Sequence, residues 1–185
     1  MPEEMVIRHC SPTLAGLKTG SLFSCRYETK EALREDVRAM NHLLVPKGLR
    51  VLSLRYREGL ALIYLYRPDR LDRDLTAPAA ARLLEERGYP CGNADLCVVK
   101  LLHQLRERRE FPHEIGLFLG YPPDDVEGFI RWGAQCYKCV GDWKVYGDEA
   151  QARRLFDQYR RCTRAYQALW RRGKTVEQLA VAQPA

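Results

Sequence analysis

Hydrophobic runs in the first third of the chain predict a small antiparallel sheet. Four segments have the short apolar or alternating pattern of β-strands, namely EMVIRH (4–9), GSLFSCRY (20–27), LRVLSLRY (49–56) and LALIYLYR (60–67). The REG loop at 57–59 ends in glycine, which predicts a three-residue bulged hairpin between the last two strands. Because the apolar run at 60–66 is continuous, it predicts a strand that is buried on both faces.

Helical spacing dominates the rest of the chain. The segment at 29–44 repeats apolar residues at helical intervals, with Thr29 as the expected N-cap and Pro46 and Gly48 beyond its end. After Pro68 we expect helices over 77–87, over 94–109, from Pro112 as the first helical residue to a stop at Gly120, over 122–134, and from Asp148 to about Arg172. The last of these should bury a stripe of Leu155, Tyr159, Cys162, Tyr166 and Leu169, and 137–147 should form a short strand or an ordered loop.

This order of elements predicts an α+β fold. A small N-terminal antiparallel sheet with one helix is followed by a mainly helical C-terminal half packed on it. The length of 185 residues suits one domain with a sizeable core. We therefore expect a single domain over 1–185, with a sheet-rich part at 1–68, a helical part at 69–174 and a tail at 175–185.

Composition predicts a cytoplasmic protein. The apolar share is 46% and the charged share 29%, as in ordinary globular proteins. The longest apolar run, 60–66, is too short to cross a bilayer, and the opening MPEEM lacks the basic start of a signal peptide. Seven cysteines form an odd, scattered set, which favours reduced thiols over a disulfide framework.

The net charge of +6 is concentrated near the C-terminus. Residues 151–174 hold eight basic residues and the single acid Asp157, so this segment carries +7 and the rest of the chain −1. The arginines should lie on the outer faces of the last helix, and five of them could contact a nucleic acid or an acidic partner: Arg153, Arg154, Arg160, Arg161 and Arg164. An ordinary solvated face explains them equally, and no known nucleic-acid motif supports binding.

The segment RHCSPTLAGLKTG (8–20) is the first candidate site. Cys10 would lie where a strand gives way to a loop, and the nearby positive charge of Lys18 would favour its nucleophilic thiolate. Adjacent residues of a strand face apart, so His9 would not be the base for Cys10. Thr13 and the loop amides could hold an anion. The alternative is a turn that contains a buried, inert cysteine.

Two further segments carry candidate chemistry. His113 and Glu114 should begin a helix, where a neutral imidazole or a carboxylate could act as a base, or where Glu114 could simply satisfy backbone amides. Cys136 and Cys139 have CxxC spacing, but the nearest other pair, Cys91 and Cys97, has the wrong spacing for zinc. We therefore predict no metal site, and the sequence indicates no particular cofactor.

Three segments resemble one bacterial family. HCSPTLAGLK (9–18), FPHEIGLFLGYPPDDVEGFI (111–130) and GDWKVYGD (141–148) are similar to signature blocks of the domain of unknown function 3793 family, found mostly in anaerobic Firmicutes. The resemblance names no activity, although it implies a redox or iron context. The blocks contain the candidate residues already described together with Trp143, Lys144 and Tyr146, and they leave out the CxxC pair and the arginine-rich helix.

The leading hypothesis is therefore a small thiol-dependent enzyme whose site combines these segments. Cys10 would be the nucleophile or redox thiol, and His113 or Glu114 the proton acceptor. Binding of a small anionic or planar substrate would fall to His9, Thr13, Lys18, Trp143, Lys144 and Tyr146. The competing hypothesis is a non-catalytic protein that binds a small-molecule ligand or cofactor in the same cleft, or a macromolecule on its basic helix.

Overall fold

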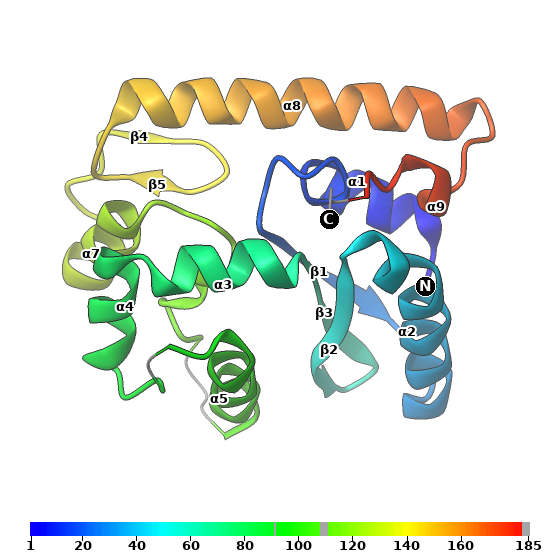
Figure 1. Cartoon of the computed structure of the whole chain (residues 1–185), viewed down its shortest axis with the longest axis horizontal. Helices are drawn as coiled ribbons and strands as arrows, with labels where there is room; N and C mark the ends of the chain where they lie inside the picture. The colour runs from blue at the N-terminus through cyan, green and yellow to red at the C-terminus, as the bar shows by residue number, and fades with distance from the viewer. Residues whose placement is uncertain (91, 108–110, 183–185) are drawn as a thin grey trace. The chain divides into compact units, whose positions relative to one another are not determined.

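The structure, a computed structural model, describes residues 1–90, 92–107 and 111–182. These residues form two compact units: unit 1 consists of Met1–Asp69 and Arg161–Ala185, and unit 2 of Arg70–Arg160. The sequence predicted a boundary between the sheet-rich and helical parts at residue 68, and the first stretch of unit 1 ends at Asp69. That the whole chain forms a single domain stays a prediction. Figure 1 traces the elements along the chain.

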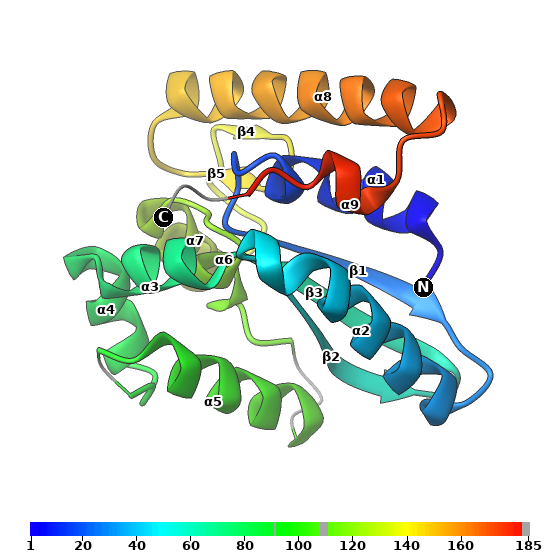
Figure 2. The same ribbon diagram turned by 45° about the vertical axis from the view of Figure 1, so that its right-hand side comes forward.

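Unit 1 is built on a three-stranded antiparallel sheet of β1 (Gly20–Arg26), β2 (Arg50–Arg57) and β3 (Leu60–Tyr66), as Figure 2 shows. The strand order is β1-β3-β2, so the most apolar strand lies in the centre. Its residues from Ile63 to Tyr66 are all buried, which confirms the prediction of a strand covered on both faces.

The hairpin between β2 and β3 differs from the expected one. Arg57 pairs with Leu60, so the loop contains two residues, Glu58 and Gly59. Both have positive φ, 52° and 75° respectively, as a tight type I′ turn requires. The prediction of a three-residue loop was therefore wrong, and the bulge instead lies within β2 between Ser53 and Arg55.

The strand predicted at 4–9 is also wrong, because this segment belongs to the helix α1 (Glu3–Leu14). Val6, Ile7, Cys10 and Leu14 recur at helical intervals and all four are fully or almost fully buried. Pro12 lies within the last turn, where the missing amide costs one hydrogen bond. Packing of the apolar helical face therefore overrides the short strand-like pattern.

One face of the sheet and three helices enclose the core of unit 1. α1, α2 (Lys30–Leu44) and the short α9 (Val176–Leu179) pack their apolar side chains against alternating residues of the strands, including Phe23, Val51 and Ile63. α2 begins as predicted, with the Thr29 hydroxyl accepting a hydrogen bond from the Ala32 amide. A 3₁₀ turn, η1 (Val45–Lys47), follows it.

Unit 2 is mainly helical. α3 (Pro68–Thr76) leads into it from unit 1 and is followed by α4 (Pro78–Glu85), α5 (Ala94–Glu107), α6 (Ile115–Phe118), α7 (Pro123–Trp132) and a two-stranded hairpin of β4 (Cys139–Val140) and β5 (Lys144–Val145). The first of these helices was not predicted as a separate element. Residues 108 and 109 of the predicted helix over 94–109 lie outside the described residues. The helix expected to start at Pro112 begins three residues later, at Ile115.

The last helix, α8 (Glu149–Arg171), begins in unit 2 and ends in unit 1. Its start is the predicted one, with the Gln151 amide donating to Asp148 Oδ1 at 2.9 Å. The expected inner stripe is only partly correct, since Ala152, Phe156 and Tyr159 are the buried residues while Leu169 is exposed. Together these elements confirm the α+β fold. None of the described helices is both long and apolar enough to cross a membrane.

Candidate functional site

Unit 2 contains a cavity of about 360 Å³, within the size range of small-molecule sites. Its wall is made by two segments, one running from Phe111, ahead of α6, into α7 and the other formed by the β4–β5 hairpin. The lining residues are Phe111, His113, Ile115, Gly116, Tyr121, Asp125, Val126, Phe129, Asp142, Trp143 and Lys144. The second and third family-like segments thus meet around one pocket.

Aromatic rings form most of the pocket wall. Tyr121 and Trp143 are stacked, with centroids 4.6 Å apart and planes 27° apart. The rings of His113 and Phe129 form a T-shaped contact, with centroids 4.9 Å apart and planes 87° apart. Behind the pocket, Phe156 of α8 supports Trp143 in a similar edge contact at 4.5 Å. A wall of fixed rings suits a planar, apolar ligand surface.

The carboxylate of Asp125 fixes the Trp143 side of the pocket. Asp125 lies in the first turn of α7 and is 3% exposed. Its Oδ2 accepts a hydrogen bond from Trp143 Nε1 at 2.6 Å, and its Oδ1 accepts from the amides of Tyr146 at 2.7 Å and Gly147 at 2.8 Å. Three donors on one buried carboxylate lock the hairpin and the indole to α7.

Two glycines let the elements around the pocket approach closely. A Cβ atom on Gly116 would lie 2.8 Å from Val126 Cγ2, and one on Gly128 would lie 2.4 Å from Tyr146 Cγ. Both distances are well below van der Waals contact, so a larger residue would force α6 and the hairpin away from α7. These positions therefore serve the shape of the pocket.

The basic groups of the pocket gather at Phe129. Lys144 Nζ lies 5.4 Å from the Phe129 centroid and 5.7 Å from that of Tyr137, within cation–π range of both rings. Lys144 forms no ion pair with any residue that the structure describes. Asp142 belongs to the other part of the wall, where its carbonyl accepts a hydrogen bond from the Tyr121 hydroxyl at 3.4 Å.

Glu114 points into different surroundings from its neighbour His113. It is 5% exposed, does not line the pocket, and accepts a hydrogen bond from the Tyr89 hydroxyl at 3.1 Å. Arg87 Nε lies 3.8 Å from its other oxygen. The structure therefore surrounds Glu114 with partners that stabilise its charge in the interior of unit 2.

Tyr146 lies behind the pocket wall and is not one of its lining residues. It is buried against Gly128, its hydroxyl donates to the Gly133 carbonyl, and its ring stacks on Trp132 at 5.8 Å. Of Trp143 and Tyr146, which were both predicted to bind substrate, only Trp143 lines the cavity.

The first family-like segment lies in unit 1, and its residues are largely enclosed. Cys10 has no exposed surface, and burial raises the pKa of its thiol to about 12 despite the opposing effects of Lys18 and Ser21. The Thr13 hydroxyl is buried and lies 2.9 Å from the Ser21 hydroxyl. These surroundings disfavour the thiolate that a catalytic Cys10 requires.

His9 and Lys18 flank this segment. His9 is exposed overall, and its ring stacks on Phe23 with a centroid distance of 5.7 Å. The pKa of His9 is lowered first by its partial burial and second by the charge of Arg8. The residue lies on α1, so the argument that neighbouring strand residues face apart does not apply. Cys10 and Lys18 belong to unit 1 and His113 and Lys144 to unit 2, and the shared site stays a prediction.

The CxxC pair lies in the hairpin region of unit 2, with Cys136 exposed and Cys139 buried. Within the described residues, no group of three or more His, Cys, Asp or Glu side chains is arranged to hold a metal ion. Cys91, part of the other pair weighed for zinc, lies outside the described residues, whereas Cys97 is buried with its thiol donating to the Pro90 carbonyl at 3.1 Å.

The arginines of α8 are exposed as predicted, but two of them are already paired. Arg153 contacts Glu149 at 2.6 Å, and Arg160 pairs with Asp157. Arg154, Arg161 and Arg164 form no ion pair with any described residue. The strongest uncompensated positive charge therefore lies towards the C-terminal end of the helix.

Sequence reasoning found His113, Trp143 and Lys144 but missed most of the pocket. Tyr121, Asp125 and Phe129 lie inside the quoted block at 111–130, yet they were not singled out. Asp125 lies near the start of the predicted helix over 122–134, where an exposed acid is also expected because it stabilises the helix dipole. The available signal was the density of aromatic residues and glycines in that block.

The fold and the pocket together define an α+β protein with a cavity lined by aromatic rings in its second unit. The chain belongs to the family described as Protein of unknown function (DUF3793), whose model matches residues 6–180. This match confirms the resemblance seen in the three segments. No curated protein and no solved structure matches the chain.

Proposed function

We propose that the protein binds a small planar anion in the pocket of unit 2. The observation that carries this proposal is the combination of stacked aromatic walls with Lys144, a pocket cation without an ion-pair partner among the described residues. A ligand ring would lie against Trp143 and Phe129, and its anionic group would approach Lys144 and His113. Apolar burial supplies most of the affinity and the charge supplies orientation.

Asp142 and Asp125 also line the pocket, and their positions are compatible with an anion. Asp125 directs its oxygens to Trp143 Nε1 and two backbone amides, which disperse its charge. The carbonyl of Asp142 accepts a hydrogen bond from the Tyr121 hydroxyl. The two basic side chains of the pocket, His113 and Lys144, instead lie beside the Phe129 ring. The anionic group is therefore expected at the Phe129 side.

Binding without thiol chemistry is the function that the site supports best. The thiol-dependent enzyme stays a prediction, as do its redox or iron context and its cytoplasmic location. Burial of Cys10, which raises the pKa of its thiol to about 12, and enclosure of Glu114 both speak against their catalytic roles. If the pocket also performs a reaction, His113 is the titratable residue in its wall best placed to move a proton.

Calorimetric titration of the whole chain with 1-naphthoate, a planar aromatic anion, tests the site. Phe129→Ala removes one wall ring and should weaken binding at least tenfold, since a buried aromatic contact contributes about 1.5 kcal/mol or more. Trp132→Ala is the matched control, because Trp132 is on the same helix but 45% exposed and outside the pocket. Equal effects of the two substitutions, or loss of binding in Cys10→Ala, would contradict the proposal.

A further inference from the structure

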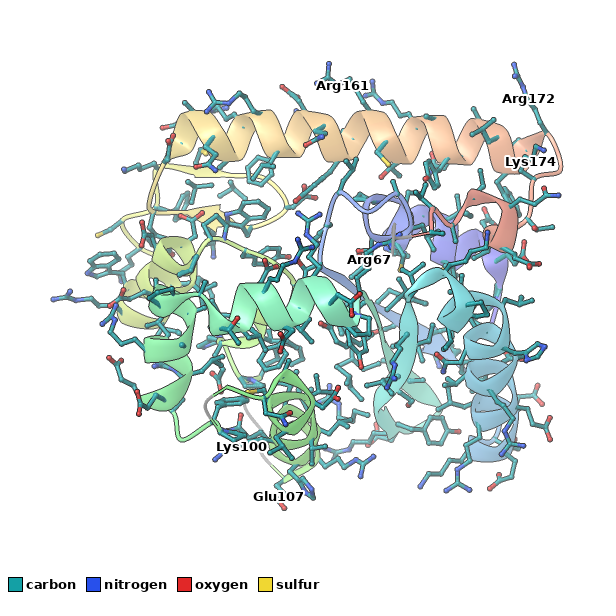
Figure 3. All side chains as sticks on the ribbon, viewed as in Figure 1. Arg67, Lys100, Glu107, Arg161, Arg172 and Lys174 are labelled. Carbon is teal, nitrogen blue, oxygen red and sulfur yellow. The ribbon has the colours of Figure 1, made fainter. Side chains whose placement is uncertain are left out.

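The end of α8 in unit 1 carries an exposed group of arginines that the pocket does not use. We define the arginine face as Arg161, Arg164, Arg171 and Arg172. All four are exposed, and none forms an ion pair with a described residue. Lys174 lies three residues after the end of the helix, and Figure 3 shows Arg161 and Arg172 projecting from the same side of it.

Three of the arginines, Arg161, Arg164 and Arg171, lie on α8, and Arg172 is the first residue after it. At 3.6 residues per turn the three helical arginines fall within an arc of about 80° around the axis. The nearest acids along the chain are Asp157, which already pairs with Arg160, and Glu177 in α9. The arginine face thus has a local excess of cations.

Spacing along the helix divides the arginine face into two pairs. The pair Arg161 and Arg164 and the pair Arg171 and Arg172 have centres nine residues apart, or about 14 Å at 1.5 Å per residue. The exposed Ala168 lies between them on the same side. The face therefore has a cation pair at each end and a low, uncharged centre.

The distance of about 14 Å between the two arginine pairs is close to the width of the B-DNA major groove, which is about 12 Å. Each pair would therefore reach the phosphates on one side of the groove. Arginine guanidinium groups bind phosphate oxygens in pairs of parallel hydrogen bonds. The small side chain of Ala168 would allow the helix to approach the groove closely. In A-form RNA the major groove is deep and narrow, so the same spacing fits it less well.

The opposite side of α8 argues against a lipid surface as the partner. Tyr166 and Trp170 are half-buried and pack against the core of unit 1. A helix that binds a membrane needs an exposed apolar face to insert between the lipids, and here that face is already covered. From these observations we infer that the arginine face binds the backbone of double-stranded DNA, independently of the sequence of bases.

Fluorescence anisotropy of a labelled 20-base-pair duplex with the whole chain tests this inference. Four phosphate contacts predict a slope of about −3.6 in log affinity against log salt, or roughly a 150-fold loss of affinity between 50 and 200 mM salt. Arg171→Gln with Arg172→Gln should reduce the slope by about 2. The matched control is Arg34→Gln with Arg38→Gln on exposed positions of α2, which should leave the slope unchanged.

A second pair of variants tests the low centre of the arginine face. Ala168→Glu places a negative charge between the two arginine pairs and should weaken DNA binding at least tenfold. Ala39→Glu makes the same change at an exposed position of α2 and should have little effect. The inference would be overturned if Ala168→Glu and Ala39→Glu lost DNA affinity equally. It would also be overturned if the double arginine variants of α8 and α2 lowered the salt slope equally.

The choice of partner is tested with three competitors. Double-stranded RNA of the same length, phosphatidylserine vesicles and poly-glutamate should each displace the duplex less well than unlabelled DNA. Stronger displacement by any of them would replace DNA as the partner. Titration with 1-naphthoate should be the same in all these variants, so failure of this inference and failure of the pocket proposal are distinguishable.

Discussion

The surroundings of Cys10 in unit 1 differ from the pocket of unit 2 both in residue types and in packing. Around Cys10 a hydroxyl pair and the thiol are packed without exposed surface. Around Trp143, rings and a lysine instead surround a cavity of about 360 Å³. Both regions come from family-like segments. The comparison indicates that one such segment serves packing in unit 1, whereas the other two surround the pocket that we propose as a ligand site in unit 2.

Thiol reactivity should separate the two regions most strongly. With a pKa of about 12, Cys10 is almost entirely protonated at pH 8, whereas an ordinary thiol with a pKa near 8.5 is partly ionised. Iodoacetamide should therefore modify Cys10 on the order of 1,000-fold more slowly than exposed Cys136. Peptide mass mapping at timed intervals measures both rates. Modification of Cys10 first would break the comparison and revive the thiol-dependent enzyme.

Removal of the Asp125 carboxylate should cause the largest loss of stability. Asp125→Ala leaves Trp143 Nε1 and the amides of Tyr146 and Gly147 without their acceptor, and the expected cost is about 3 kcal/mol or more. Urea denaturation measures this change. Asp124→Ala is the control, because Asp124 is an exposed acid in the same helical turn and should cost below about 1 kcal/mol.

A smaller effect is expected from the hydroxyl of Thr13. Thr13→Val leaves the Ser21 hydroxyl without this buried partner, so the free energy of unfolding should fall by about 1–2 kcal/mol. Binding of 1-naphthoate in unit 2 should not change. Weaker binding with unchanged stability would instead support the substrate-binding role predicted for Thr13.

The smallest expected effect concerns alkaline pH and the pocket wall. Burial, followed by the charges of Asp142 and Tyr159, raises the pKa of Tyr121 to about 12, above its usual value near 10. Between these values the unfolded chain releases the phenol proton while the folded chain keeps it, so stability falls as the pH rises from about 10 to 12.

Tyr121→Phe should reduce that loss while keeping the ring stacked on Trp143. The change in unfolding free energy between pH 9 and pH 11 is the quantity to compare. Tyr137→Phe, on an exposed ring, is the control and should leave the pH dependence as it is. A pH dependence that is identical in the wild type and Tyr121→Phe would show that the phenol titrates freely.

The sequence predicted most elements, but it predicted a strand at 4–9 where the helix α1 lies, because a strand pattern and a helix pattern overlap there. β1, α2 and β3 follow from local apolar spacing, since each is long enough to show its period. At 4–9 only six residues were considered, and within them the pair Val6 and Ile7 suits a strand or a helix. The full spacing to Leu14 reveals the helix, but Pro12 and Gly16 suggested a turn.

The pocket was harder to predict because it depends on contacts distant in sequence. The sequence pointed to Trp143 and Lys144, but their position in the pocket depends on the hydrogen bonds that the hairpin donates to Asp125. Glu114 and Tyr146 were predicted as site residues, but neither lines the cavity. Glu114 is next to the pocket residue His113 in the chain, and Tyr146 is two residues from Lys144, yet local geometry turns both side chains into the interior. Adjacency in sequence therefore did not predict which side chains line the cavity.

The central claim is that the pocket selects a planar anion through Lys144, and calorimetry with a matched pair of probes tests it most directly. The wild type should bind 1-naphthoate about tenfold more tightly than the neutral 1-naphthalenemethanol, a difference of about 1.4 kcal/mol. Lys144→Gln should abolish this preference, and Lys30→Gln on exposed α2 should retain it. Equal affinity of the two probes for the wild type, or a preference that persists in Lys144→Gln, would contradict the account.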